Sequence, residues 1–163
     1  MVESKSQAAM EHRIAARPRT LVLLASFNGA AWIEEQLRTI LDQANTDVQI
    51  VVRDDGSSDE TIAIANRLRD PRIDLVRAAQ PSGSAAQNFF AMIREHPAEG
   101  CDYVAFADQD DAWGADKLDR ASSALAATRA AGYSSAVTAV WANGRKRDIA
   151  QAAFVSSSTH VRT

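Results

Sequence analysis

The stretch that most limits the fold is residues 20–27 (TLVLLASF), which is apolar almost throughout. A strand with one face in water alternates apolar and polar residues, whereas a strand buried on both faces is nearly continuously apolar. Strands of the second kind occur in parallel sheets whose two faces are covered by helices. The run therefore predicts an inner strand of a helix-covered parallel sheet.

The rest of the chain alternates segments of helical spacing with short apolar runs. Alternation of this kind predicts an α/β fold, with a Rossmann-like, mostly parallel sheet and helices on both faces. The expected strands are residues 20–27, 48–52, 73–76, 103–107 and 135–141, the last entering a tight turn at Asn143-Gly144. The expected helices are residues 32–44, 62–68 (capped by Ser57 and Glu60), 84–93 and 118–132.

Polar residues stand at the carboxyl ends of three of the predicted strands. Ser26 and Asn28 end the first strand, Asp54 and Asp55 end the second, and an acidic cluster at residues 108–111 ends the fourth. In parallel α/β sheets, ligands bind outside the carboxyl ends of the strands. We therefore expect these side chains to converge on one crevice.

The acidic cluster reads Asp108-Gln109-Asp110-Asp111 and lies between an apolar run and Trp113. Carboxylates this close repel one another unless a cation neutralises them. A solvated loop of carboxylates is the alternative, but the position directly after a buried strand favours a binding site. Ligands that are all oxygen favour Mg²⁺ or Mn²⁺ over zinc, and magnesium sites commonly combine one or two carboxylates with phosphate oxygens.

The segment after the second strand, residues 54–59 (DDGSSD), allows two interpretations. Asp, Ser and Gly are common where a strand turns into a helix, so the segment could serve only as a turn and a cap. A carboxylate at this strand end can also accept hydrogen bonds from a base N–H or a sugar hydroxyl, as in dinucleotide-binding sheets. The Gly-x-Gly-x-x-Gly pattern of those sheets is absent after the first strand, which disfavours an ordinary dinucleotide fold.

Net charge, the length of apolar stretches and the cysteine count limit the partners and the compartment of the protein. The net charge of −3 gives no electrostatic reason to expect a nucleic acid partner. No apolar stretch reaches the roughly 18 to 20 residues that span a bilayer, so no transmembrane segment is predicted. The single cysteine, Cys101, rules out an internal disulfide and favours a reducing compartment. These features predict a cytoplasmic protein, which could also lie at the inner face of the membrane.

Several motifs together resemble a known family. They occur in order as Ser26-Phe27-Asn28-Gly29, Glu35-Gln36-Leu37, residues 54–59, Asn88-Phe89, and residues 108–113 followed by Lys117-Leu118. This order and spacing is similar to that of family 2 glycosyltransferases, above all rhamnosyltransferases of bacterial surface-polysaccharide assembly. The resemblance covers residues 20–125.

The resemblance implies a GT-A fold and a metal-dependent, inverting transfer of a sugar such as rhamnose. The donor would be a nucleotide-diphosphate sugar, dTDP- or UDP-linked, and the acceptor a saccharide or lipid-linked saccharide. Asp108 and Asp110 match the family's Asp-x-Asp motif, so Asp110, with Asp108, would hold Mg²⁺ or Mn²⁺. Carried over by motif, the donor-binding residues would be Ser26, Phe27, Asn28, Asp54, Asp55, Asn88 and Asp108.

The family's inverting members also use a carboxylate base on the acceptor side, within reach of the acceptor hydroxyl. After Asp119 the sole acid of this sequence is Asp148, beside three basic residues at 145–147. We expect Asp148 to form a surface salt bridge, so no catalytic residue is assigned. The expected organisation is a flexible leader at 1–19, a nucleotide-sugar-binding domain at 20–142 and an irregular tail at 143–163. In this interpretation the chain is C-terminally truncated and lacks the acceptor-binding part.

Two alternatives stay open. The chain could be a nucleotide-sugar-binding fragment without turnover, because no base is identified. It could also be a phosphoacceptor domain of the receiver or haloacid-dehalogenase kind, since both place aspartates at strand ends. The acidic cluster follows the fourth strand rather than the first, and no acid ends the third strand, which disfavours the phosphoacceptor interpretation.

Overall fold

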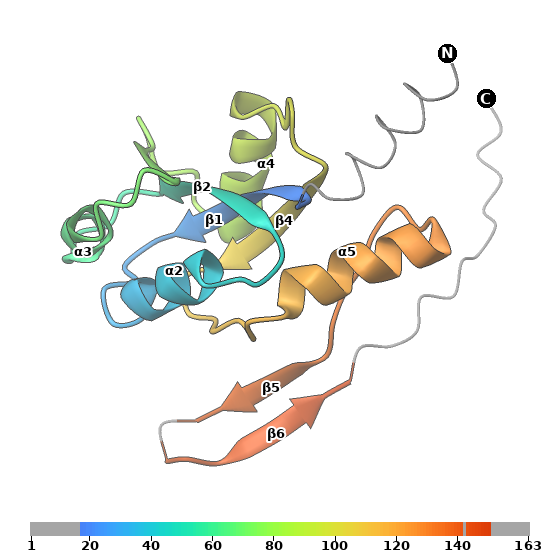
Figure 1. Cartoon of the computed structure of the whole chain (residues 1–163). Coiled ribbons are helices and arrows are strands. Elements are labelled where there is room, and N and C mark those ends of the chain that lie inside the picture. The colour runs from blue at the N-terminus through green and yellow to red at the C-terminus, as the bar shows by residue number, and fades with distance from the viewer. Residues whose placement is uncertain (1–16, 142, 151–163) are drawn as a thin grey trace, which may run out of the picture. The chain divides into compact units, whose positions relative to one another are not determined.

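The computed structural model describes residues 17–141 and 143–150 (Figure 1). The chain divides into two compact units, the first ending at Ser123 and the second beginning at Ala124. The strands are β1 Arg19–Ser26, β2 Asp47–Asp54, β3 Ile73–Arg77, β4 Tyr103–Asp108, β5 Val137–Val140 and β6 Lys146–Ile149. The helices are α2 Ile33–Leu41, α3 Thr61–Arg67, α4 Ala85–Glu95 and α5 Lys117–Thr128.

The first unit contains a four-stranded parallel sheet in the order β3-β2-β1-β4. β1 lies between β2 and β4, and every residue of it from Thr20 to Ser26 is buried. The apolar run therefore forms an inner strand, and the predicted mostly parallel sheet is confirmed. The strand ends one residue earlier than expected, because Phe27 leaves the sheet and its side chain is 53% exposed.

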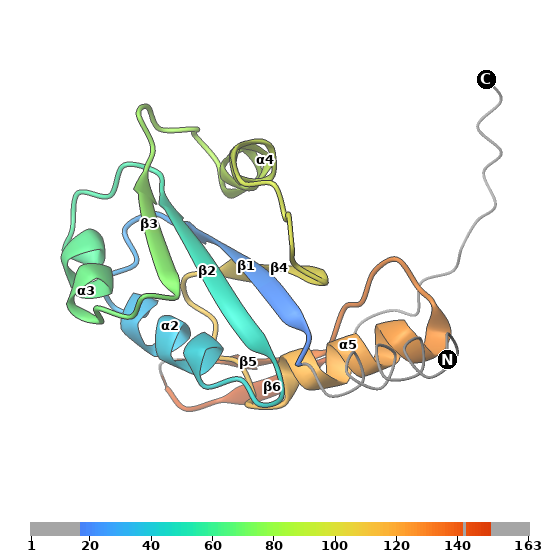
Figure 2. The ribbon, with the colours of Figure 1, turned by 45° about the horizontal axis from the view of Figure 1, so that its top comes forward.

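Helices cover both faces of this sheet, and the alternation of side chains along β1 decides which residue meets which helix. Val22 and Leu24 belong to the core cluster that holds buried residues of α2 and α3. Leu21, Leu23 and Ala25 belong to the cluster that holds Met92 of α4. Figure 2 shows the sheet between α4 on one side and α2 and α3 on the other. The three-layer arrangement explains why β1 must be apolar on both faces.

Helix boundaries differ from the sequence expectation at several ends. Trp32 was expected on the apolar face of the first helix, but it precedes α2 and is 49% exposed. The core does not need the Trp32 side chain, because Ile33, Leu37 and Ile40 already form the buried face of α2. The last helix, expected to reach residue 132, ends at Thr128. Ends of helices fray and depend on local contacts, so the pattern predicts the body of a helix better than its limits.

The second unit contains an antiparallel pair, β5 and β6. The Asn143-Gly144 turn joins the two strands as predicted, with Gly144 at φ +79°. The strand β6 lies inside the segment 143–163 that was expected to be irregular, so the boundary predicted between the domain and the tail separates two paired strands. The rest of that tail, residues 151–163, and residues 1–16 of the predicted leader lie outside the described residues. Within the part of the chain that the structure describes, no helix has the length and apolarity that a membrane crossing requires.

Candidate functional site

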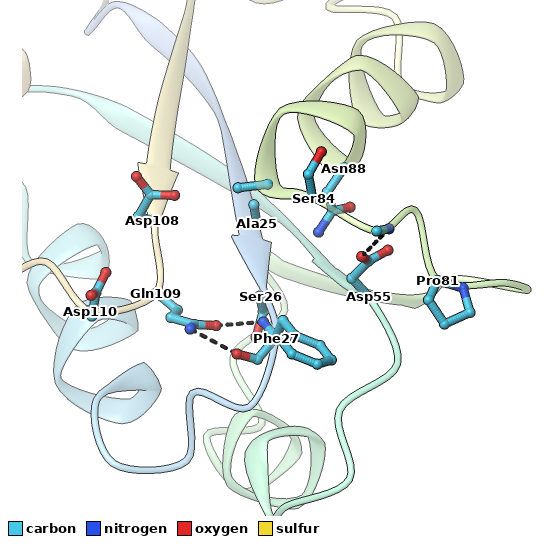
Figure 3. Close-up of a pocket in the computed structure, with 12 residues that line it drawn as sticks. Ala25, Ser26, Phe27, Asp55, Pro81, Ser84, Asn88, Asp108, Gln109 and Asp110 are labelled. Carbon is cyan, nitrogen blue, oxygen red and sulfur yellow. Dashed lines mark hydrogen bonds between the residues drawn. The ribbon is translucent and has the colours of Figure 1, made fainter.

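A pocket of about 360 Å³ lies at the carboxyl ends of β1 and β4, next to the loop after β2 and the start of α4 (Figure 3). The predicted convergence of strand ends is therefore observed within the first unit. Six of the residues singled out from the sequence line this pocket: Ser26, Phe27, Asp55, Asn88, Asp108 and Asp110. Two others, Asn28 and Asp54, are not among the lining residues.

Asp54 is fully buried and acts on its own loop. Its carboxylate accepts hydrogen bonds from the N–H of Gly56 (3.2 Å), the N–H of Ser57 (2.9 Å) and the hydroxyl of Ser57. Gly56 has φ +93°, a backbone conformation that side-chain-bearing residues rarely adopt, so the chain turns sharply here. The carboxylate thus satisfies buried donors that the turn would otherwise leave unpaired.

Asn28 joins this loop to the loop after β1. Its N–H donates to the Ser57 hydroxyl (2.8 Å), and its side-chain oxygen accepts from the N–H of Ser58 (2.9 Å). Asn28 itself has φ +50°, which asparagine tolerates better than most residues. Ser57 was predicted to cap the following helix together with Glu60. That prediction is wrong, because α3 begins at Thr61 and the Ser57 hydroxyl is used by Asp54.

Asp55, in contrast to its neighbour, lines the pocket. It accepts hydrogen bonds from the N–H groups of Ser82 (2.7 Å) and Gly83 (3.3 Å), which hold the loop before α4 against the end of β2. Its Oδ1 lies 3.6 Å from Nη1 of Arg53, and both side chains are buried. A buried carboxylate needs such partners, since removal from water is costly unless hydrogen bonds and a counter-charge replace it.

Arg53 supports the pocket from outside its lining, and the sequence did not predict this role. Its Nη1 donates to Oδ1 of Asn88 (2.7 Å), and Asn88 donates back from Nδ2 to the Arg53 carbonyl (3.0 Å). Its Nε also pairs with Glu95 near the end of α4 (3.3 Å). The network fixes α4 to β2 and places Asn88 in the pocket wall. The available signal was a lone cation at the end of an apolar strand, directly before two aspartates.

Gln109, between the two expected metal ligands, was also missed. Its Oε1 accepts from the N–H of Phe27 (2.5 Å), and its Nε2 donates to the carbonyl of Phe27 (2.9 Å). Figure 3 shows this amide bridging the acidic loop and the end of β1, with the Phe27 ring beside the pocket. The sequence offered no signal beyond its position between two aspartates.

One lining residue, Ser26, has a buried hydroxyl without a partner among the described residues. Ser26 is 1% exposed, lines the pocket, and its hydroxyl makes no hydrogen bond in the structure. The start of α4 lies on the same pocket, with Ser84 as its N-cap. A helix N-terminus carries partial positive charge, so this side of the pocket favours a ligand with anionic or acceptor oxygens.

Across the pocket from Ser84 and Asn88, the end of β4 carries Asp108 and Asp110 of the acidic cluster (Figure 3). Burial raises the pKa of Asp108, and the nearby charges of Asp111 and Asp110 raise it further. Burial and Asp110 likewise raise the pKa of Asp111, partly offset by Lys117. A divalent cation would relieve this repulsion, and the oxygen donors suit Mg²⁺ or Mn²⁺.

The described residues contain no group of three or more His, Cys, Asp or Glu side chains arranged to hold a metal. Asp108 and Asp110 both line the pocket, while Asp111 is not among its lining residues. The residues present therefore fit a cation that takes one or two carboxylates from the protein and its other oxygens from a ligand.

The loop after the acidic cluster is held by α2 and by Gln43, which follows that helix. The hydroxyl of Thr39 accepts from the N–H of Trp113 (3.1 Å). Gln43 donates to the carbonyl of Gly114 (2.8 Å) and accepts from the N–H of Leu118 (2.9 Å). These contacts fix the far end of the acidic loop, so its carboxylates stand on an anchored segment.

Comparisons with known proteins agree with this architecture. A profile of the family described as Glycosyl transferase family 2 matches residues 21–157. The chain is 39% identical over 126 residues to the dTDP-rhamnosyl transferase RfbG of Shigella flexneri, covering 76% of this chain and 44% of that protein. It is 35% identical over 106 residues to the putative teichuronic acid biosynthesis glycosyltransferase TuaG of Bacillus subtilis, covering 64% and 40%.

Solved structures show the same fold. The mannosyltransferase PcManGT from Pyrobaculum calidifontis, in complex with GDP-Man and Mn²⁺, matches with a TM-score of 0.59 and 28% identity over 69% of this chain and 33% of that one. TarS 1–349 of S. aureus matches with a TM-score of 0.60 and 24% identity over 68% and 33%. These likenesses confirm the GT-A type of fold. The chain spans less than half the length of the relatives it matches, 44% of RfbG and 40% of TuaG. With the family profile covering most of its residues, the chain belongs to glycosyl transferase family 2.

Proposed function

We propose that the pocket is the donor site of a glycosyltransferase and binds a nucleoside diphosphate together with Mg²⁺ or Mn²⁺. The observation that carries this proposal is that one pocket contains both carboxylates that could hold a cation and groups that suit a base and phosphate oxygens. An exposed aromatic ring and a helix N-terminus lie in the same pocket as Asp108 and Asp110. A base can stack on the ring, and phosphate oxygens suit both the helix end and a cation held by the carboxylates.

The nucleoside end of the ligand would lie at Phe27, whose ring is half exposed beside the pocket. Ser26 would line the ligand site at the end of β1. Asp55 and Asn88 would support the pocket wall, and each has free acceptor capacity beyond its protein partners. In this assignment Asp54 and Asn28 are positioning residues, because their side chains hold the two loops together rather than line the pocket.

Asp110 and Asp108 would hold the divalent cation, with the remaining coordination supplied by the ligand and water. When bound, the cation would supply charge neutralisation to the diphosphate as it departs. The protein's own contribution is to fix these two carboxylates. β4 carries Asp108, and Gln43 anchors the loop that follows Asp110 at Gly114.

The sugar and the acceptor are proposed from the relatives. RfbG is named as a dTDP-rhamnosyl transferase, which supports dTDP-rhamnose as the donor. Another relative, WfaP of Escherichia coli, is named as acting on a diphosphoundecaprenol-linked sugar, which supports a lipid-linked saccharide as the acceptor. We also predict an inverting transfer in surface-polysaccharide synthesis. The predicted location is the cytoplasm, at the inner face of the membrane.

A second candidate function is nucleotide-sugar binding without turnover by this chain. The observation in its favour is the lack of an assignable base. Asp148, the sole acid after Asp119, accepts a hydrogen bond from the Thr138 hydroxyl (2.7 Å) on the neighbouring strand of the hairpin. Sugar release from dTDP-rhamnose or UDP-glucose to an added acceptor would contradict the non-catalytic alternative.

The test of the donor site is calorimetric titration with UDP and with dTDP, each with and without MnCl₂. Metal-dependent binding is expected, and Asp110→Asn should remove the metal dependence while preserving the fold. Asp74→Asn removes the same charge from an exposed position of β3 outside the pocket and serves as the matched control. Metal-dependent binding that survives in Asp110→Asn would contradict the metal assignment.

A further inference from the structure

The side chain of Gln109 continues the sheet where the strands themselves stop. The ladder between β1 and β4 ends with the pair Ala25 and Asp108. One residue later, the side-chain amide of Gln109 replaces the backbone as the partner of β1. It accepts from the N–H of Phe27 at 2.5 Å and donates to the Phe27 carbonyl at 2.9 Å. The end of β1 is therefore held by a side chain of the acidic loop.

The chemistry of this contact requires an amide. One atom of the side chain must accept and another must donate, 82 residues away along the chain. A carboxylate of the same length could accept from the N–H but would repel the carbonyl, and an apolar side chain could do neither. The contact is also directional, so a movement of the Gln109 backbone would change the position of Phe27.

Gly29 makes room for this amide. A Cβ added at Gly29 would lie 2.7 Å from both Cδ and Oε1 of Gln109, closer than non-bonded atoms approach. Gly29 is not among the glycines with positive φ, so its backbone conformation does not itself require glycine. The requirement at position 29 is therefore space for Gln109.

The two ends of Gln109 connect the two halves of the proposed donor site. Its backbone lies between Asp108 and Asp110, the proposed cation ligands, and its amide holds the backbone of Phe27, the proposed base-stacking residue. We propose that Gln109 is a positioning residue that couples cation binding to nucleoside binding. The inference rests on the proposed donor site and adds to it the element through which one half of the ligand affects the other.

The coupling has a measurable form. A cation that fixes the acidic loop also fixes Gln109, and through it the Phe27 backbone, so each ligand should raise the affinity for the other by the same factor. We define the coupling factor as the Kd for UDP or dTDP without MnCl₂ divided by the Kd with MnCl₂. Direct contact between cation and diphosphate contributes to this factor equally in wild type and in variants that keep both aspartates.

The first variant is Gln109→Met, which keeps the length of the side chain and removes both hydrogen bonds. The coupling factor should fall by about fivefold or more, a typical size for coupling between sites. Affinity for pyrophosphate with MnCl₂ should stay within about twofold, because the two cation ligands are unchanged. Gln87→Met, at an exposed position of α4 outside the pocket lining, is the matched control and should keep the wild-type factor.

The second variant, Gly29→Ala, displaces the amide without changing it. It should also lower the coupling factor, and its effect should vanish in a Gln109→Ala background, where the atoms that its Cβ would meet are gone. Thermal unfolding of each variant shows whether the fold is kept. The two variants reach the same contact from opposite sides, so one suffices if the other fails to fold.

Two results would overturn the inference. An unchanged coupling factor in Gln109→Met would show that the contact carries no coupling. If both Kd values rise by the same factor in that variant, Gln109 only supports the fold. A wild-type chain that binds neither nucleotide would overturn the donor site and this inference with it, whereas an unchanged coupling factor leaves the donor site standing.

Discussion

Replacing Asp54 by alanine should destabilise the protein far more than it weakens ligand binding. The carboxylate is fully buried and accepts three hydrogen bonds, from two N–H groups and one hydroxyl. In Asp54→Ala, the N–H and the hydroxyl of Ser57 would be left buried without this acceptor, since Ser57 is 6% exposed. Each unsatisfied buried donor costs about 1–3 kcal/mol.

The magnitude follows from these contacts. Two such donors give about 2–6 kcal/mol, and the Gly56 N–H adds less because it is partly exposed. Removing a buried charge returns part of this cost, because the carboxylate no longer has to be stripped of water. We therefore expect a net loss of about 3 kcal/mol in the free energy of unfolding, a large share of the 5–15 kcal/mol typical of a domain.

The measurement is urea unfolding followed by circular dichroism, beside nucleotide titration under conditions where each variant is folded. Asp47→Ala, an exposed position at the start of β2, is the control and should change stability by no more than about 0.5 kcal/mol. Asp54→Asn, which keeps the size and one acceptor, should lie between wild type and Asp54→Ala. Wild-type stability in Asp54→Ala, combined with loss of nucleotide binding, would refute the reasoning and place Asp54 in contact with the ligand.

Three further predictions test the site and its supports. Phe27→Ala should weaken UDP or dTDP binding by about 1–3 kcal/mol in calorimetry, as loss of base stacking does. Its melting temperature should not change, because Gln109 bonds only to the backbone of residue 27. Unaltered affinity would contradict base stacking. Gln43→Ala should lower the free energy of unfolding by about 2 kcal/mol in urea, since the buried N–H of Leu118 loses its acceptor. A smaller effect than that of Gln49→Ala, at an exposed position of β2, would contradict the stabilising role of the Gln43 contacts. Hydrogen bonds from the Thr61 hydroxyl and from the N–H groups of Ala30 and Thr61 lower the pKa of Asp59, so its stabilisation is present above the ordinary value of 3.8 and is lost as the pH falls through the lowered value. The stability difference between wild type and Asp59→Asn should therefore shrink on acidification below that range, and a difference independent of pH would contradict the assignment.

The pKa shift of Asp108 has the opposite sign and concerns the cation. A proton binds this carboxylate more tightly in the folded protein than in the unfolded chain, because burial and the neighbouring aspartates disfavour its charge. Protons and a divalent cation compete for the same oxygens. Acidification should therefore weaken Mn²⁺-dependent nucleotide binding at a pH above the ordinary range of an aspartate.

The amino-acid sequence was sufficient to predict the sheet and the place of the site. A strand buried on both faces has to be apolar throughout, so residues 20–27 predicted an inner strand. The strand β1 has that position in the sheet. The carboxyl ends of parallel strands lie at one edge, so polar residues after the strands had to meet there. Motif order also indicated the family. These properties depend on local pattern and on rules common to all such sheets.

Only the tertiary structure showed that Asp54 and Asp55 have different roles. The two are chemically identical neighbours, yet one satisfies its own turn while the other lines the pocket and receives N–H groups of Ser82 and Gly83. Asn88 lies 35 residues from Arg53 in the sequence, and Phe27 lies 82 residues from Gln109, so no local pattern predicts these two contacts. A buried polar group takes whichever partner the fold brings within about 3 Å, and that choice depends on the packing of the loops rather than on neighbouring residues.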